Sequence, residues 1–172
     1  MTQGNDLRGD YSHIEDDYTI AQDWQAYSEA EHDLWRKLYA RQSAILPGYA
    51  ADDYIVNLSK LDAADGIPHF GRVSEQLFAA TGWQLVAVPG LVPDEVFFDH
   101  LANRRFPVTV WLRTPEEMDY LVEPDIFHDF FGHVPMLYDP VFADTVPRGR
   151  KPLPQVGLKT LRGCTGTWSS LA

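Results

Sequence analysis

Apolar residues recur at helical spacing in three segments of the first eighty residues. The first segment starts where Ser28 is followed three residues later by Glu31, the arrangement of a helix capping box. From there, one face of a helix collects apolar and aromatic side chains, and Pro47-Gly48 ends the pattern. The side chains on this face are Leu34, Trp35, Leu38, Tyr39 and Ile45.

The two segments that follow have the same period. Residues 51–61 place four inward side chains on one face of a predicted helix: Tyr54, Ile55, Leu58 and Leu61. Residues 71–81 do the same with Val73, Leu77 and Phe78, and Gly82 is suited to end that helix. We expect all three helices to be scaffold.

Beyond residue 82 the pattern changes from helical spacing to alternation. Residues 83–88 and 106–112 alternate as strands do, with Pro89-Gly90 breaking the first run. Residues 93–103 between them predict a helix that carries Phe97, Phe98 and Leu101. The sequence has no internal repeat and no glycine-rich phosphate loop. The predicted fold is therefore mainly helical α+β with a small sheet.

Composition narrows the class of partner. The 172 residues carry a net charge of −11, which disfavours binding to nucleic acid or to an anionic membrane surface. No apolar run approaches the roughly 20 residues that span a bilayer. The single cysteine, Cys164, excludes an internal disulfide and favours a cytoplasmic location. We expect a small-molecule ligand, and a disordered lead-in over residues 1–18.

Charge is distributed unevenly along the chain. All 25 acidic residues precede residue 145, whereas residues 145–172 hold five basic side chains and no carboxylate side chain: Arg148, Arg150, Lys151, Lys159 and Arg162. Three prolines, four glycines and Cys164 lie in the same stretch. The change indicates a linker, a basic tail or a segment of different origin, so we treat residues 145–172 as an atypical basic tail.

The segment from Glu123 to Pro135 is where we expect chemistry. His128 and His133 lie among acidic and aromatic residues, but five residues place two side chains about 140° apart on an ideal helix. Both could face one metal ion if the helix is distorted or ends between them, and Gly132 and Pro135 offer such a break. Otherwise, they are two surface or capping histidines.

The neighbours of the histidines favour a metal site. Phe127, Phe130 and Phe131 would form an apolar wall, and Asp125 and Asp129 are close enough in sequence to orient an imidazole N–H. Two imidazoles and one carboxylate are the ligand set of non-haem Fe(II) oxygenases. A zinc hydrolase is the less favoured alternative, because no glutamate adjoins either histidine as a general base.

The run Glu123-Pro-Asp-x-x-His-Asp-x-x-Gly-His-Val-Pro resembles the iron-binding signature of the pterin-dependent aromatic amino acid hydroxylases. Three other stretches also resemble that family: Val88-Pro-Gly-Leu-Val-Pro-Asp-Glu-Val-Phe-Phe, Arg104-Arg-Phe-Pro-Val-Thr, and Asp17-Tyr-Thr-Ile with Gln22-Asp-Trp. The resemblance covers residues 17–144, and residues 19–144 would be the N-terminal portion of the catalytic domain. It is to compact bacterial members that hydroxylate L-phenylalanine to L-tyrosine with O₂, a tetrahydropterin and Fe(II). Tryptophan or tyrosine is the alternative substrate.

Carried over by position, the resemblance assigns roles to individual residues. His128 and His133 would bind the iron, and Asp129 would face the pterin through water. Arg113 would hold the substrate carboxylate with its two-pronged guanidinium, and Pro124 would line the pocket for the substrate ring. Phe97 would stack on the pterin ring. The other residues of the pterin site would be Gly90, Leu91, Val92 and Asp94.

The family completes its iron site with a glutamate about forty residues after the second histidine. No aspartate or glutamate follows Asp144 in this sequence. A truncated gene product, a shifted reading frame or a chimeric end would each explain this. The sequence therefore predicts a catalytic-domain fold that is incomplete at its C-terminus. It also leaves open a second function, that of a catalytically impaired fragment that binds pterin without turnover.

Overall fold

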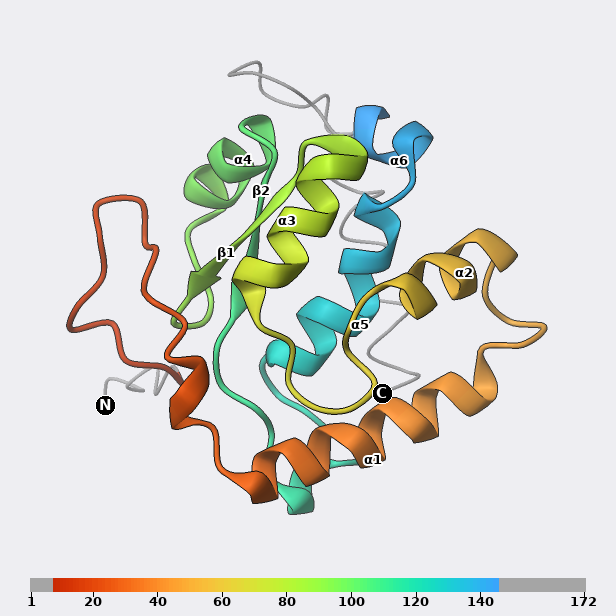
Figure 1. Cartoon of the computed structure of the whole chain (residues 1–172). Helices are drawn as coiled ribbons and strands as arrows, with labels where there is room; N and C mark the ends of the chain where they lie inside the picture. The colour runs from red at the N-terminus through yellow and green to blue at the C-terminus, as the bar shows by residue number, and fades with distance from the viewer. Residues whose placement is uncertain (1–7, 146–172) are drawn as a thin grey trace.

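The computed structural model describes residues 8–145, and the basic tail predicted over residues 145–172 lies almost entirely outside this range. Six α-helices, two short 3-10 helices and two strands are formed by the described residues (Figure 1). The helices and strands are η1 (Trp24–Ala26), α1 (Glu29–Ile45), α2 (Asp52–Lys60), α3 (Phe70–Thr81), β1 (Gln84–Val88), α4 (Asp94–Ala102), β2 (Arg105–Thr109), η2 (Pro115–Glu117), α5 (Ile126–Leu137) and α6 (Pro140–Thr145). This confirms the mainly helical α+β prediction.

Helix α1 begins with the predicted capping box. The Ser28 hydroxyl accepts from the Glu31 backbone N–H, and the Glu31 carboxylate accepts from the Ser28 N–H, so both orphan donors are satisfied. Leu34, Trp35 and Leu38 are buried as expected. Ile45 is 43% exposed, contrary to the prediction. It is the last residue of the helix, and the next residue, Leu46, is buried instead.

Helices α2 and α3 lie within one residue of their predicted bounds. Gly82 ends α3 in the left-handed conformation, with φ of +76°, as the sequence indicated. Val73 and Leu77 of α3 are buried, but Phe78 is 59% exposed and does not join the core. Helical period alone placed Phe78 inward. In the structure, Phe70, Val73 and Leu77 form the buried face of α3, and Phe78 lies outside it.

The sheet consists of β1 and β2, which pair in parallel with Gln84 opposite Arg105 and Val88 opposite Thr109. The second strand ends at Thr109, three residues before the predicted end. Beyond it, the backbone groups bond to other parts of the chain: Val110 O accepts from the Tyr27 hydroxyl, and Trp111 O accepts from Ile126 N–H. Burial continues past the strand at Leu112 and Arg113 but does not alternate over residues 106–112, so the paired strand is shorter than the alternation in the sequence predicted.

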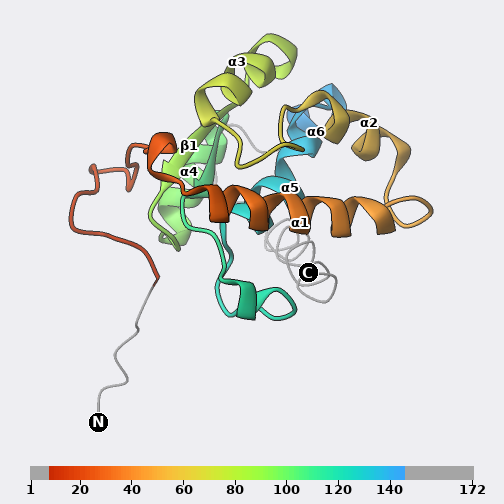
Figure 2. The same cartoon turned by 60° about the horizontal axis from the view of Figure 1, so that its bottom comes forward.

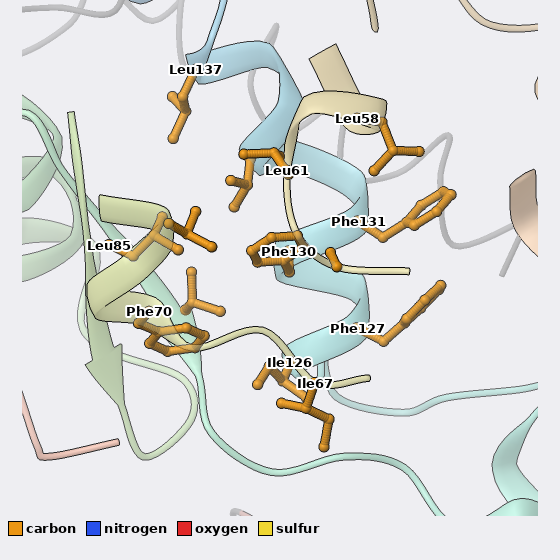
Figure 3. Close-up of a cluster of buried hydrophobic side chains, with 14 of the residues drawn as sticks. Leu58, Leu61, Ile67, Phe70, Leu85, Ile126, Phe127, Phe130, Phe131 and Leu137 are labelled. Atoms are coloured by element: carbon orange, nitrogen blue, oxygen red, sulfur yellow. The ribbon is translucent and has the colours of Figure 1, made fainter. Parts of the chain in front are cut away.

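Helix α5 occupies the middle of the molecule, where it contacts β2, α1 and α2. Figure 2 shows α1 crossing in front of it. Three phenylalanines of α5 are buried: Phe130 points toward Leu61, Phe70 and Leu85, while Phe127 and Phe131 lie on the side of Leu58 (Figure 3). The rings of Phe127 and Phe131 stack, with centroids 5.0 Å apart and planes 19° apart. The predicted aromatic wall is therefore the centre of the core.

Residues 8–18 differ from the disordered lead-in that the sequence predicted, although residues 1–7 lie outside the described range. The segment has little regular structure, but its side chains make long-range contacts. Arg8 Nη1 donates to Glu117 Oε1 at 2.6 Å, and its guanidinium lies 4.4 Å from the Trp111 ring centroid. Asp17 Oδ2 accepts from Arg105 Nη1 at 2.9 Å. Polar composition alone could not reveal these partners.

Candidate metal centre

Asp125 is the N-cap of α5, and its carboxylate accepts hydrogen bonds from two neighbours. Asp125 Oδ1 accepts from the His128 backbone N–H at 2.8 Å, which caps the helix. The same carboxylate pairs with Arg113, with Oδ2 accepting from Nε at 2.9 Å and Oδ1 from Nη2 at 3.0 Å. The two side chains are 1% and 0% exposed. A fully buried ion pair is tolerated only when its hydrogen bonds are made, as they are here.

His128 and His133 approach each other on one unbroken helix. Their ring centroids are 5.3 Å apart, and the ring planes are inclined by 69°. The expected break between them is absent: α5 runs from Ile126 to Leu137 through Gly132 and Pro135. The long imidazole side chains cover the angular gap of five residues, so the helix need not end.

Asp129 fixes the orientation of His128. Its Oδ1 atom accepts from His128 Nδ1 at 3.0 Å, and its Oδ2 atom accepts from the Thr109 backbone N–H at the end of β2 at 2.9 Å. With Nδ1 donating, the lone pair of His128 is on Nε2, the atom that a metal would bind. The prediction that Asp129 orients an imidazole is consistent with this contact, whereas Asp125 bonds the backbone of His128 and not its ring.

The pKa values of the two imidazoles are shifted in opposite directions. Desolvation lowers the pKa of His133 to about 4, with a further lowering by the nearby His128, so His133 is neutral at pH 7. Desolvation also lowers the pKa of His128, but the hydrogen bond and charge of Asp129 outweigh it and leave the value raised. A metal would therefore compete with a proton mainly at His128.

The residues predicted to face the pterin lie in and after the loop that follows β1. Gly90 is buried, and a Cβ at this position would lie 2.6 Å from Arg8 O and 2.7 Å from the Tyr11 hydroxyl oxygen. The glycine is therefore required by the close approach of the N-terminal segment. Leu91 is 47% exposed and its carbonyl accepts from the Tyr11 hydroxyl at 3.0 Å, while Val92 is partly buried. Asp94 is exposed in the first turn of α4.

A row of aromatic rings connects this loop region with the histidines. Phe97 of α4 contacts Phe106 of β2 with ring centroids 6.3 Å apart, and Phe106 contacts His133 with centroids 5.8 Å apart. Phe97 is partly buried. The structure thus brings the candidate pterin-stacking residue to the same side of the sheet as the candidate metal ligands.

The residues predicted to bind substrate lie at the start of α5. Pro124 is partly buried and directly precedes Asp125. The Arg113 guanidinium uses Nε and Nη2 for Asp125 and lies 5.7 Å from the Phe127 ring centroid. The bidentate geometry predicted for a substrate carboxylate is therefore made to a carboxylate of the chain itself, which leaves Nη1 for another acceptor.

A third protein ligand is not supplied by residues 8–145. No cluster of three or more histidine, cysteine, aspartate or glutamate side chains in that range has the geometry to hold a metal ion. Asp129, the nearest carboxylate, is engaged by His128 and Thr109. The described residues therefore fit two positions of a metal coordination sphere, both filled by imidazole.

Sequence reasoning missed three contributors to this region. Thr109 supplies the N–H that anchors Asp129, and Phe106 joins Phe97 to His133. Tyr11 holds the carbonyl of the loop after β1. Alternation indicated that Phe106 and Thr109 lie on opposite faces of a strand, but strand pairing and the approach of residues 8–18 had no local signal.

The helical fold with its small sheet, the paired histidines and the carboxylate beside them are features of the aromatic amino acid hydroxylase catalytic domain. The model of the biopterin-dependent aromatic amino acid hydroxylases matches residues 7–149, and the chain belongs to this family. The catalytic-domain fold implied by the sequence resemblance is thus confirmed.

Several relatives of this chain are bacterial phenylalanine-4-hydroxylases. The protein of Caulobacter vibrioides is 61% identical over 129 residues, which cover 74% of this chain and 44% of the relative. That of Chromobacterium violaceum is 56% identical over 134 residues, or 77% of this chain and 45% of the relative. A crystal structure of the latter with iron(III) and 7,8-dihydrobiopterin superposes with a TM-score of 0.74 at 57% identity, covering 77% of this chain and 49% of that one. The chain thus spans less than half the length of these relatives.

Proposed function

We propose that this chain carries the cofactor-facing part of a phenylalanine 4-monooxygenase, which converts L-phenylalanine to L-tyrosine with O₂, a tetrahydropterin and Fe(II). The observation that carries the proposal is the pair His128 and His133, held 5.3 Å apart, with Asp129 fixing the ring of His128. Iron with bound pterin supplies the redox chemistry with O₂. The residues of this chain bind and orient these groups.

In this proposal, His128 and His133 bind Fe(II) through imidazole nitrogens. The loop residues Gly90, Leu91 and Val92, together with Asp94, face the pterin, and Phe97 stacks on its ring. Arg113 binds the substrate carboxylate through Nη1, since its Nε and Nη2 atoms donate to Asp125. Pro124 lines the pocket for the substrate ring. Asp129 completes a water-mediated contact to the pterin.

Partners and location follow from the same properties. Small molecules are the partners, and the net charge of −11 disfavours nucleic acid. Among residues 8–145, no helix has the length and apolar character needed to cross a membrane. The single cysteine is in keeping with a cytoplasmic protein.

We expect residues 1–172 alone to hold Fe(II) weakly and to turn over slowly. Two imidazoles without a carboxylate leave the charge of the ion poorly neutralised and its occupancy low. This is the impaired-fragment alternative, and it is favoured by the lack of a third ligand among residues 8–145.

The test compares metal binding and product formation in four proteins. Bound Fe(II) is quantified for residues 1–172, for His128→Ala, for His133→Ala and for the control His13→Ala, whose side chain is exposed. Conversion of L-phenylalanine to tyrosine is measured with excess Fe(II) and tetrahydropterin. Hydroxylation of L-tryptophan, the alternative substrate, is measured under the same conditions. We expect both site variants to lose iron and the control to keep it. Unchanged iron retention in the site variants would refute the site.

A further inference from the structure

Helix α5 contains a proline two residues after the second histidine. Pro135 has no backbone N–H, so the carbonyl four residues earlier, that of Phe131, loses its donor within the helix. Phe131 lies between His128 and His133 and is 3% exposed, which removes water as the usual substitute. A buried, unpaired carbonyl at this point would loosen the helix between the two candidate ligands.

The missing donor comes from a neighbouring helix. Tyr54 of α2 donates its hydroxyl to Phe131 O, in a buried contact between residues 77 positions apart in the chain. The Tyr54 side chain is 4% exposed, and its ring lies 6.4 Å from the Phe131 ring. Burial raises the pKa of this hydroxyl above its ordinary value of 10, so it stays protonated and able to donate. Figure 3 shows Leu58, one turn along α2, on the same side of α5 as Phe131.

We propose that Tyr54 is a positioning residue for the metal centre: its hydroxyl replaces the helix donor removed by Pro135 and so fixes the backbone between His128 and His133. The mutual orientation of the two imidazoles depends on the five-residue span that contains this carbonyl. The rings themselves touch different neighbours, His128 at Asp129 and His133 at Phe106. The inference rests on the metal site proposed above.

The first test removes only the hydroxyl. Tyr54→Phe keeps the ring, and Tyr27→Phe is the matched control, because the Tyr27 hydroxyl also donates to a backbone carbonyl, that of Val110, at 2.6 Å. Co(II) is titrated into residues 1–172 and its absorption gives the affinity, alongside urea unfolding of each variant. We expect Tyr54→Phe to weaken Co(II) binding about tenfold, as loss of a supporting partner does at metal sites. Tyr27→Phe should change it by no more than about twofold.

The second test restores a donor inside the helix. Pro135→Ala supplies an N–H at position 135 that can reach Phe131 O, so the Tyr54 hydroxyl becomes dispensable. We expect Tyr54→Phe to cost about twofold or less in Co(II) affinity in this background. The proposal can also be tested if the Tyr54→Phe protein fails to fold. In that case the double variant, Tyr54→Phe with Pro135→Ala, should fold and bind Co(II).

The outcomes separate the two proposals. Equal losses from Tyr54→Phe in both backgrounds, no loss in either, or a double variant that neither folds nor binds would overturn the positioning role while leaving the metal site intact. If residues 1–172 do not bind Co(II), or if His128→Ala and His133→Ala bind it as well as the unaltered chain, the metal site itself fails, and the role of Tyr54 fails with it.

Discussion

The helices α1–α3 and the segment from β2 to α5 bury charge very differently. In the scaffold, the ion pairs of Arg36 with Glu29 and Asp33 lie at the surface. In the segment from residue 105 to 137, Arg113 and Asp125 are completely buried, and Asp129 is only 15% exposed. Buried charges are costly unless every hydrogen bond is made. The site segment thus contains buried charged side chains that need specific partners in addition to its part of the apolar core, whereas these ion pairs of the scaffold lie at the surface.

The strongest test of this difference removes one aspartate that is ion-paired with an arginine from each of the two regions. Asp125→Ala leaves the Arg113 charge buried without its partner and removes the cap of α5, so we expect a loss of about 3–5 kcal/mol in the free energy of unfolding. Asp33→Ala, in a surface pair with Arg36, should produce no change outside experimental error. Urea unfolding followed by circular dichroism measures both. Similar losses in the two variants would show that burial does not distinguish the pairs.

Asp129 permits a test of metal binding within the site segment. Asp129→Asn lacks the charge that holds His128, and we expect Co(II) affinity to fall by about 10–100-fold. The control is Asp139→Asn. Its carboxylate accepts from the backbone N–H groups of Val141 and Phe142 at the start of α6, away from the histidines. Affinity is measured by metal titration. An equal fall in both variants would remove the special role of Asp129.

On the scaffold side, the capping box of α1 should affect stability alone. Ser28→Ala removes the side chain that accepts from Glu31 N–H, and we expect a loss of about 1 kcal/mol in the free energy of unfolding. Ser59→Ala is the control, since that hydroxyl donates to Val56 O late in α2 and caps no helix start. Co(II) binding should be the same in both. A loss of binding in Ser28→Ala would contradict the division between the regions.

The same division explains what could be predicted from the sequence. Helical period and capping residues placed α1, α2 and α3 within one or two residues, because local hydrogen bonds and one buried face determine such helices. The errors within them, Ile45 and Phe78, each adjoin a buried leucine, Leu46 or Leu77, at the edge of the inward face. Only the tertiary arrangement decides where such a face ends.

Prediction was weaker wherever a polar side chain chooses a partner far away in the chain. The motif identified His128, His133 and Asp129, and Asp129 indeed contacts His128. No local pattern predicted that Arg113 would pair with Asp125, that β2 would stop at Thr109, or that the Tyr54 hydroxyl would donate to Phe131 O. Each of these contacts depends on how separate segments pack. The roles assigned to the metal-, pterin- and substrate-binding residues stay predictions.

Gly132 gives the smallest and most specific test, because the sequence indicated a helix break there and the structure has a continuous helix. A Cβ at Gly132 meets nothing among residues 8–145 within 4 Å, so alanine is accommodated without strain. Alanine loses less backbone entropy than glycine in a helix, and we expect Gly132→Ala to stabilise the fold by about 0.5–1 kcal/mol with Co(II) affinity unchanged.

The contrasting variant is Gly82→Ala, which forces alanine into a φ of +76° and should destabilise the fold by about 1 kcal/mol or more. Both are measured by urea unfolding. If Gly132→Ala is destabilising like Gly82→Ala, the backbone between the histidines departs from a helix, and the convergence of the two rings has another cause.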